Sequence, residues 1–133
     1  MDTELVHLDT TGREVTDLTG AVESFCAGRG SGLCSVFAPH ATAGLALMET
    51  GSGSEADLIE CLSRVLPRPG AYGHRHGTPG HGADHVVPVL VSPSLVVPVV
   101  DGRLALGTWQ SIVLVDTNAD NPQRTVRLSF VPG

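Results

Sequence analysis

SLVVPVVDGRLALGTWQSIVLVD, residues 94–116, is the stretch of sequence that decides the fold. Its β-branched side chains gather in two runs, residues 95–100 and 108–116, which are typical of strands. Between the runs, the pair at 101–102 is Asp-Gly, a hairpin-turn signal, and residues 104–106 supply the returning strand. Further on, residues 125–131 alternate apolar with polar side chains, as a strand with one buried face does. The second half of the chain is therefore predicted to be rich in strands.

The first half of the chain carries helical periodicity. Apolar side chains spaced i, i+4, i+7 over residues 18–25 follow Asp17, a good N-cap, and a second stripe covers residues 58–65. Residues 5–8 and 13–16 flank a Thr-Thr-Gly turn and are predicted to form an opening hairpin. The sum is about seven strands with helices between them, an α+β or sandwich-like fold in one domain, residues 1–133.

Charge and composition exclude some classes of partner. The formal net charge is −6, and the chain has no lysine, which argues against nucleic acid because phosphate binding needs clustered basic side chains. No apolar run approaches the roughly 18 residues of a membrane helix, so no membrane partner is expected. The N-terminus lacks the basic start and apolar run of a signal peptide, which predicts a cytoplasmic protein. Three widely spaced cysteines argue against a disulfide framework.

Histidines point to a candidate site. Four of the six lie between residues 74 and 85, within a segment rich in glycine and proline that is predicted to be a surface loop. His81 and His85 are spaced i, i+4, so a helical turn would bring them to one face. Residues 33–38 are predicted to form a buried strand, and His40 follows the proline after it, on a rigid support that suits a ligand. The alternative is a solvated polar loop, since the spacing matches no defined zinc motif.

Several blocks of the sequence resemble the YjbQ-like family. They cover nearly the whole chain in the family's order, and Gly-Thr-Trp-Gln after a Gly-Arg-Leu hairpin is the most specific of them. The blocks are PHATAGL at 39–45, YGH at 72–74, ADH at 83–85, PSLVVPV at 93–99 and GRLALGTWQ at 102–110.

The resemblance implies a compact α+β fold, a YjbQ-like β-sandwich of mixed strands with two to three helices, which assembles as a homotrimer. It implies a divalent metal, expected to be Zn²⁺, on His40, His74 and His85, with Glu49 as the acidic residue that follows the Pro-His block. Members are often labelled thiamine-phosphate synthases after a weak activity that joins the pyrimidine and thiazole halves of thiamine phosphate.

The sequence departs from the family pattern around the implied site. Ala41 replaces a threonine, Met48 replaces an asparagine, and Asp84 sits directly before His85 instead of two positions earlier. On a helical turn that shift rotates the carboxylate by about 100°. These departures put Asp84 in doubt as the family's aspartate, and His81 is a candidate replacement.

The leading functional hypothesis is a metal-dependent enzyme acting on a small phosphorylated or heterocyclic metabolite. Glu49 would be the general acid/base, and Asp84 would orient a histidine ligand through its second ring nitrogen. The predicted substrate-binding residues are Thr42, Ser94, Arg103, Thr108, Trp109, Gln110 and Arg124. Trp109 is alternatively a core residue, Ser94 a structural hydroxyl, and the two arginines surface charges or subunit contacts. One alternative is a metal- or ligand-binding trimeric module without turnover. Another makes the histidine loop, with His74 and His76, a subunit contact that holds no metal.

Overall fold

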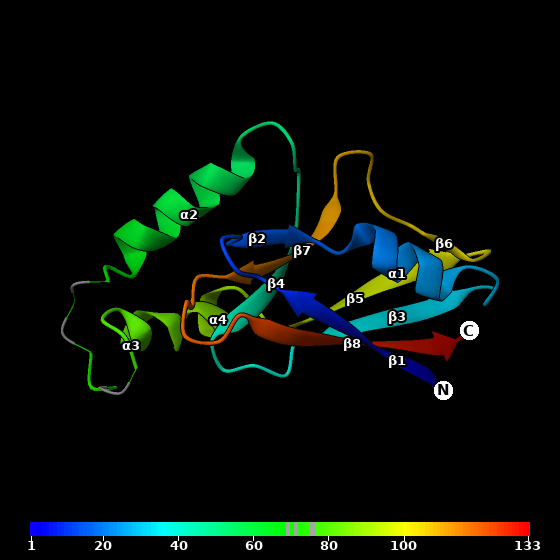
Figure 1. Ribbon diagram of the computed structural model, residues 1–133. Coiled ribbons are helices and arrows are strands. Elements are labelled where there is room, and N and C mark those ends of the chain that lie inside the picture. The colour runs from blue at the N-terminus through cyan, green and yellow to red at the C-terminus, as the bar shows by residue number, and fades with distance from the viewer. Residues whose placement is uncertain (69, 71, 75–76) are drawn as a thin grey trace.

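The computed structural model describes residues 1–68, 70, 72–74 and 77–133. Two antiparallel sheets form its framework (Figure 1), one of five strands in the order β1-β8-β3-β5-β6 and one of three in the order β2-β7-β4. The strands are β1 (Asp2–Asp9), β2 (Val15–Asp17), β3 (Gly32–Phe37), β4 (Ala43–Met48), β5 (Ser94–Val100), β6 (Arg103–Leu104), β7 (Ser111–Asp116) and β8 (Gln123–Pro132). The helices are α1 (Thr19–Cys26), α2 (Ser54–Val65), α3 (His81–Asp84) and α4 (Val87–Leu90). The α+β prediction is confirmed.

The central core lies between the two sheets. β7 shows this most clearly, because Ile112 and Leu114 join the main cluster with residues of β3, β5 and β8. The alternate side chains, Val113 and Val115, point to the opposite face and pack with Leu62 of α2. A strand with apolar side chains on both faces must be covered on both sides. The three-stranded sheet is therefore the middle layer, with the larger sheet on one side and α2 on the other.

The hairpin predicted at residues 101–102 is present. Val99 pairs with Leu104 and Val100 with Arg103. Asp101 and Gly102 have φ values of 50° and 78°. Two consecutive positive φ values are what a type I′ turn requires, and Asp-Gly supplies them at low steric cost.

The helical stripes are confirmed in part. Leu18, Val22 and Phe25 are buried in the core cluster. The N-cap of α1 is Leu18 and not Asp17 as predicted, although Asp17 Oδ1 accepts the Thr19 N–H at 2.8 Å. In α2 only Leu62 is buried, and Val65 at its end is 58% exposed. The described residues contain no helix that is long and apolar enough to span a membrane.

The predicted opening hairpin is wrong. β1 pairs with β8, whereas β2 pairs with β7 in the other sheet. The Thr-Thr-Gly segment therefore carries the chain from one sheet to the other instead of turning it back. Thr10 N donates to Pro122 O at 2.9 Å, so this crossing is tied to the loop before β8.

Two single-turn helices lie at one end of the sandwich. α3 and α4 follow the segment after α2, and Figure 1 shows α3 beyond the end of the sheets, beside the loop that joins β7 to β8. Pro88 stands at the first turn of α4, where a missing N–H has no cost. This end of the molecule holds the candidate site.

Candidate metal centre

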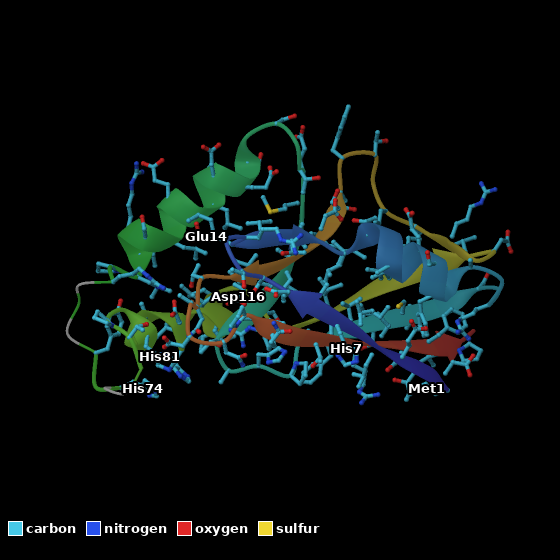
Figure 2. The ribbon with its side chains drawn as sticks, viewed as in Figure 1. Met1, His7, Glu14, His74, His81 and Asp116 are labelled. Atoms are coloured by element: carbon cyan, nitrogen blue, oxygen red, sulfur yellow. The ribbon has the colours of Figure 1, made fainter. Side chains whose placement is uncertain are left out.

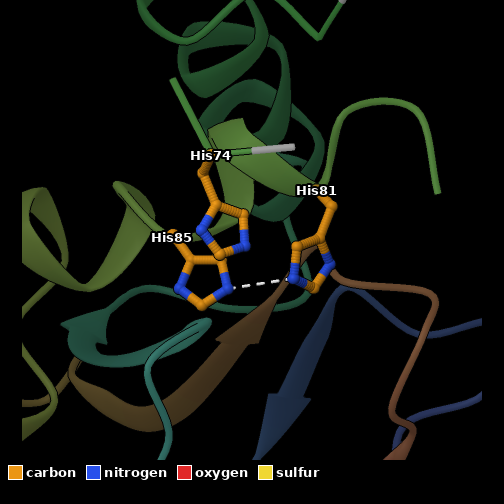
Figure 3. Close-up of side chains that lie close together, drawn as sticks. All are labelled: His74, His81 and His85. Carbon is orange, nitrogen blue, oxygen red and sulfur yellow. Dashed lines mark hydrogen bonds between the residues drawn. The ribbon is translucent and has the colours of Figure 1, made fainter. Parts of the chain in front are cut away.

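Three histidines come together at this end of the fold. Each of His74, His81 and His85 offers one ring nitrogen, and these nitrogens all lie within 4.8 Å of one another. The rings are 4.0 Å apart between His74 and His85, 4.7 Å between His81 and His85, and 5.1 Å between His74 and His81, measured at their centroids. Figure 3 shows the three side chains converging from two separate segments of chain.

A single helical turn brings two of these rings together. His81 begins α3 and His85 is its C-cap, with a His85 N–H to His81 O bond of 3.3 Å. The i, i+4 spacing therefore places both rings on one face, as predicted, and their Nε2 atoms are 2.9 Å apart. His74 reaches the pair from the preceding segment.

Glycine lets the chain pass close beside His81. Gly77 has a φ of 83°, and a Cβ there would stand 2.6 Å from Asp120 Oδ2 and 2.7 Å from His81 Cγ. No side chain fits in that space, and the positive φ would strain any other residue. The glycine content of this segment thus has a structural cause next to the histidines.

The histidine trio suits a transition-metal ion. Imidazole nitrogens are favoured ligands of Zn²⁺, Cu²⁺, Fe²⁺ and Ni²⁺, and three of them leave coordination positions open. The three rings already face one another, so little rearrangement is needed to aim a nitrogen from each at one point. The residues present therefore fit the ion that the resemblance implies.

A cavity of about 450 Å³ opens beside the trio. Its described lining includes His74 and His81, together with Arg68, Tyr72 and Thr78. Several glycines complete the wall, which exposes backbone N–H and C=O groups. The volume suits a small metabolite.

Asp84 lies beneath this cavity. Its side chain is 2% exposed, and its Oδ1 accepts hydrogen bonds from Arg68 Nη1 at 2.5 Å and from Thr117 Oγ1 at 2.7 Å. Arg68 Nη2 also donates to Thr117 O at 2.6 Å. Arg68 is 40% exposed, so the ion pair has its positive end at the cavity and its negative end in the protein. In the structure Asp84 fixes Arg68, whereas the sequence predicts that it orients a histidine ligand.

His40 is engaged elsewhere. Its Nε2 lies 3.0 Å from both the N and the O of Thr125, so one backbone residue occupies that nitrogen. Burial lowers the pKa of His40, and the nearby Arg124 lowers it further. The third imidazole of the cluster is His81, and His40 is not grouped with it. Among the described residues, the structure thus groups His81 with His74 and His85, whereas the resemblance implies His40 in that place.

Thr42 and Arg124 belong to a buried polar network and do not line the cavity. Arg124 is 2% and Asp116 1% exposed by side chain, and they form an ion pair. Arg124 Nη2 also donates to Thr42 Oγ1 at 2.7 Å. Thr42 and Arg124, two of the predicted substrate-binding residues, therefore have their polar atoms bonded in the interior.

The remaining predicted residues lie at the surface. Trp109 is 73% exposed. The register of β4 on β7 pairs Ala43 with Asp116 and Met48 with Ser111. Glu49 and Gln110 therefore stand at the Ser111 end of β7, about 17 Å along the strand from Asp116 at ~3.4 Å per residue. The histidine trio is linked to the Asp116 end. Ser94 in β5 and the residues at 103 and 108 are also exposed.

Sequence reasoning missed three residues of the site. Arg68, Asn118 and Asp120 are not among the residues singled out from the sequence. His81 Nδ1 lies 2.6 Å from Asp120 Oδ2 and 3.1 Å from Asn118 Nδ2. The available signal was the Asp-x-Asn-x-Asp spacing of residues 116–120, directly after a buried strand. His76 lies outside the described residues. His7, on β1, is distant from His74 and His81 in Figure 2.

The fold and the site define an α+β protein of two antiparallel sheets with a three-histidine cluster at one end. Comparison with known sequences places it further: the family model described as "UPF0047 protein YjbQ-like" matches residues 4–133. The chain belongs to this family. The resemblance inferred from the sequence blocks is thereby confirmed.

Relatives and solved structures agree with that assignment. The UPF0047 protein Rv2556c of Mycobacterium tuberculosis is 59% identical over 133 residues, which cover 100% of both chains. A UPF0047 protein of Archaeoglobus fulgidus is 34% identical, over 85% of this chain and 88% of its own. The crystal structure of hypothetical protein APE1520 from Aeropyrum pernix has a TM-score of 0.89 at 32% identity, covering 100% of both chains. A YbjQ-like protein of unknown function from Sulfolobus solfataricus, at 22% identity, shares the fold with a TM-score of 0.90, over 99% of this chain and 97% of its own.

Proposed function

We propose that the protein is a cytoplasmic metal-dependent enzyme acting on a small phosphorylated or heterocyclic metabolite. The observation that supports this most is the convergence of His74, His81 and His85, two of which, His74 and His81, line a cavity of about 450 Å³. The expected ion is Zn²⁺, held by the three imidazoles. When bound, such an ion polarises an oxygen of the ligand or lowers the pKa of a bound water.

Arg68 is the residue that would hold an anionic group of the metabolite. It lines the same cavity as His74 and His81. Its guanidinium is fixed by Asp84 and by Thr117, so little conformational entropy is lost when it takes a ligand. None of the described residues that line the cavity carries a carboxylate. A phosphate or carboxylate on the ligand would therefore meet a fixed positive charge beside the histidines.

Thiamine-phosphate synthesis is the specific reaction to test first, because the family resemblance implies it. The assay combines the phosphorylated pyrimidine and thiazole halves with protein that is metal-free or loaded with Zn²⁺, and follows thiamine phosphate by chromatography. We expect slow formation that requires the metal and is lost in His85→Ala. The matched control is His7→Ala, which changes an exposed histidine on β1.

A binding module without turnover is the second candidate, and one observation favours it. Within a single chain, Glu49 lies beside the Ser111 end of β7, whereas the histidine trio is linked to the Asp116 end. Asp84 is hydrogen-bonded to Arg68. Among the described residues, neither Glu49, the predicted general acid/base, nor Asp84 lines the cavity. Tight Zn²⁺ binding without turnover of any phosphorylated metabolite would favour this candidate over the enzyme.

A homotrimer is proposed as the working assembly. The outer face of the five-stranded sheet carries apolar side chains that are each 42% to 54% exposed, namely Leu33, Phe37, Val96, Val100 and Val131. Strand register places Leu33 beside Pro98 and Val131, so these side chains form a connected surface. A contiguous exposed apolar face of this kind marks an interaction site.

Light scattering after size exclusion tests the assembly. The wild type should have the mass of three chains, and Leu33→Asp combined with Val96→Asp should give a folded monomer. Val65→Asp, at an exposed position on α2, is the control and should leave the trimer intact. A monomeric wild type would rule the assembly out.

A further inference from the structure

The β7–β8 loop brings two polar side chains to one nitrogen of His81. Asp120 Oδ2 lies 2.6 Å from His81 Nδ1, and Asn118 Nδ2 lies 3.1 Å from the same atom. The other ring nitrogen, Nε2, faces His85 Nε2 at 2.9 Å. The β7–β8 loop therefore contacts His81 at Nδ1, while Nε2 of the same ring faces the other histidines.

Asn118 and Asp120 require opposite protonation states of His81 Nδ1. Asn118 Oδ1 accepts the backbone N–H groups of Asp120 at 2.8 Å and Asn121 at 3.1 Å, which fixes the amide with its NH₂ toward the ring. That NH₂ can only donate, so it needs an unprotonated Nδ1. The Asp120 carboxylate can only accept, so it needs a proton on Nδ1.

The contact with Asp120 should prevail. It is shorter by half an ångström, at 2.6 Å against 3.1 Å, and a hydrogen bond to a carboxylate is roughly twice as strong as one between neutral groups. Asp120 Oδ2 also accepts the Thr78 N–H at 3.2 Å. That bond holds the carboxylate beside the ring, where the same oxygen can accept the Nδ1 proton of His81.

We propose that Asp120 is the positioning residue of the histidine cluster: by accepting the Nδ1 proton of His81, it fixes the tautomer that leaves the Nε2 lone pair directed at His85. A neutral imidazole has one proton for two nitrogens, so Nε2 then carries the lone pair that a metal ligand needs. The tautomer is a property of this chain alone, whereas its use in binding a cation rests on the proposed function.

The β7–β8 loop is anchored to the core by a hydrogen bond to a buried carboxylate. Asp116 Oδ1 accepts the Asn118 N–H at 3.0 Å, and Asp116 is paired with Arg124 in the interior. The same carboxylate of Asp120 holds Thr78, next to the glycine that passes beside His81. Asp120 therefore orients both the ring and the segment that covers it, from a loop anchored by a buried ion pair.

The test is the tautomer itself. Protein labelled with ¹⁵N-histidine and stripped of metal is examined by long-range ¹H–¹⁵N correlation at neutral pH, with His81→Gln used to assign the signals. The wild type should show a protonated Nδ1 and an unprotonated Nε2 at residue 81. In Asp120→Ala the Asn118 amide, the other group described at Nδ1, can only donate to that nitrogen, so the proton should move to Nε2. Asp57→Ala, on the exposed side of α2, removes a charge elsewhere and should change nothing.

Zinc affinity provides the second readout, by competition with a chromophoric chelator. Asp120→Ala should weaken binding roughly ten- to hundredfold, the usual effect of removing the partner of a ligand histidine. Asp120→Asn should retain the wild-type tautomer, since its amide oxygen can still accept the proton. This variant also serves as the test if Asp120→Ala does not fold.

The outcomes separate the two proposals. A proton on Nε2 of His81 in the wild type, or an unchanged tautomer in Asp120→Ala, would overturn the role of Asp120. If Asp120→Asn is the only variant that folds, a proton on Nε2 of His81 in that variant would also overturn the role of Asp120. The expected tautomers without any zinc binding in the wild type would refute the proposed metal site and leave the positioning role intact.

Discussion

Arg124 and Asp116 face each other in the interior through two parallel hydrogen bonds, Nε to Oδ2 at 2.7 Å and Nη2 to Oδ1 at 3.0 Å. Thr10 Oγ1 donates to the same carboxylate at 2.9 Å. The pair joins the end of β7 to the start of β8 and borders the loop that holds His81. A buried ion pair is not in itself evidence of stability, but breaking one leaves an unpaired charge in the interior.

Asp116→Ala is predicted to destabilise the fold severely. The variant leaves the Arg124 guanidinium buried without its carboxylate, which typically costs about 3–5 kcal/mol of unfolding free energy. Urea unfolding measures the change. Glu60→Ala breaks the exposed pair of Glu60 with Arg64 and should cost less than about 1 kcal/mol. Equal small losses in the two variants would contradict the role assigned to the buried pair.

Thiol reactivity should distinguish the three cysteines. Cys26 and Cys34 are 0% exposed, whereas Cys61 is exposed on α2. Burial, followed by contact with Cys26, raises the pKa of Cys34 to about 12, and burial also raises the pKa of Cys26. The thiolate is the reactive form, so both should be inert in the folded protein.

A disulfide reagent should therefore modify one thiol rapidly near pH 8 and all three after denaturation. Cys61→Ser should abolish the rapid phase while leaving the circular dichroism spectrum unchanged. Rapid modification of two or three thiols in the folded protein would show that the interface between α1 and β3 is open to solvent.

His40 should make stability fall on acidification. Burial lowers its pKa in the folded state, whereas an unfolded histidine has a pKa near ~6.5. Below that value the unfolded chain binds more protons than the folded one, so the unfolding free energy decreases as pH falls. Above that value this contribution is fully present. Arg124 lowers the pKa further, while Thr125 and Asp116 oppose the shift in part.

The comparison of His40→Gln with the wild type isolates this contribution. Urea unfolding at pH 7.5 and at pH 5.5, both values chosen to bracket about 6.5, should show a smaller loss in the variant than in the wild type. His7→Gln, in the exposed strand β1, is the control and should retain the wild-type loss. If His40→Gln lost as much stability as the wild type, burial of a neutral imidazole would not be the cause.

Local sequence signals predicted the local structure well. The Asp-Gly turn at 101–102, the stripe of α1 and the i, i+4 pair of histidines each depend on residues close together in the chain. The pairing of β1 and β2 did not follow, because a Thr-Thr-Gly turn fits both a hairpin and a crossing between sheets. The pairing of β1 depends on β8, a strand far along the sequence, in which Phe130 lies opposite Asp2 of β1.

The candidate site shows the same division. The i, i+4 spacing alone predicted that His81 lies beside His85, whereas the family resemblance implied His40 as a metal ligand. Asp120 reaches His81 across the β7–β8 loop, and Arg68 reaches Asp84 from beyond α2, so neither contact has a short-range signal. Their roles depend on where Asp116 and its neighbours leave the core, which only the folded chain defines.

The most direct test of the account is the zinc content of His81→Gln beside that of His40→Gln, measured by mass spectrometry after dialysis against a weak chelator. The account predicts that His81→Gln loses the metal and that His40→Gln retains it, because His81 stands with His74 and His85 while His40 is bound to Thr125. Loss of zinc in His40→Gln, with full zinc in His81→Gln, would contradict it.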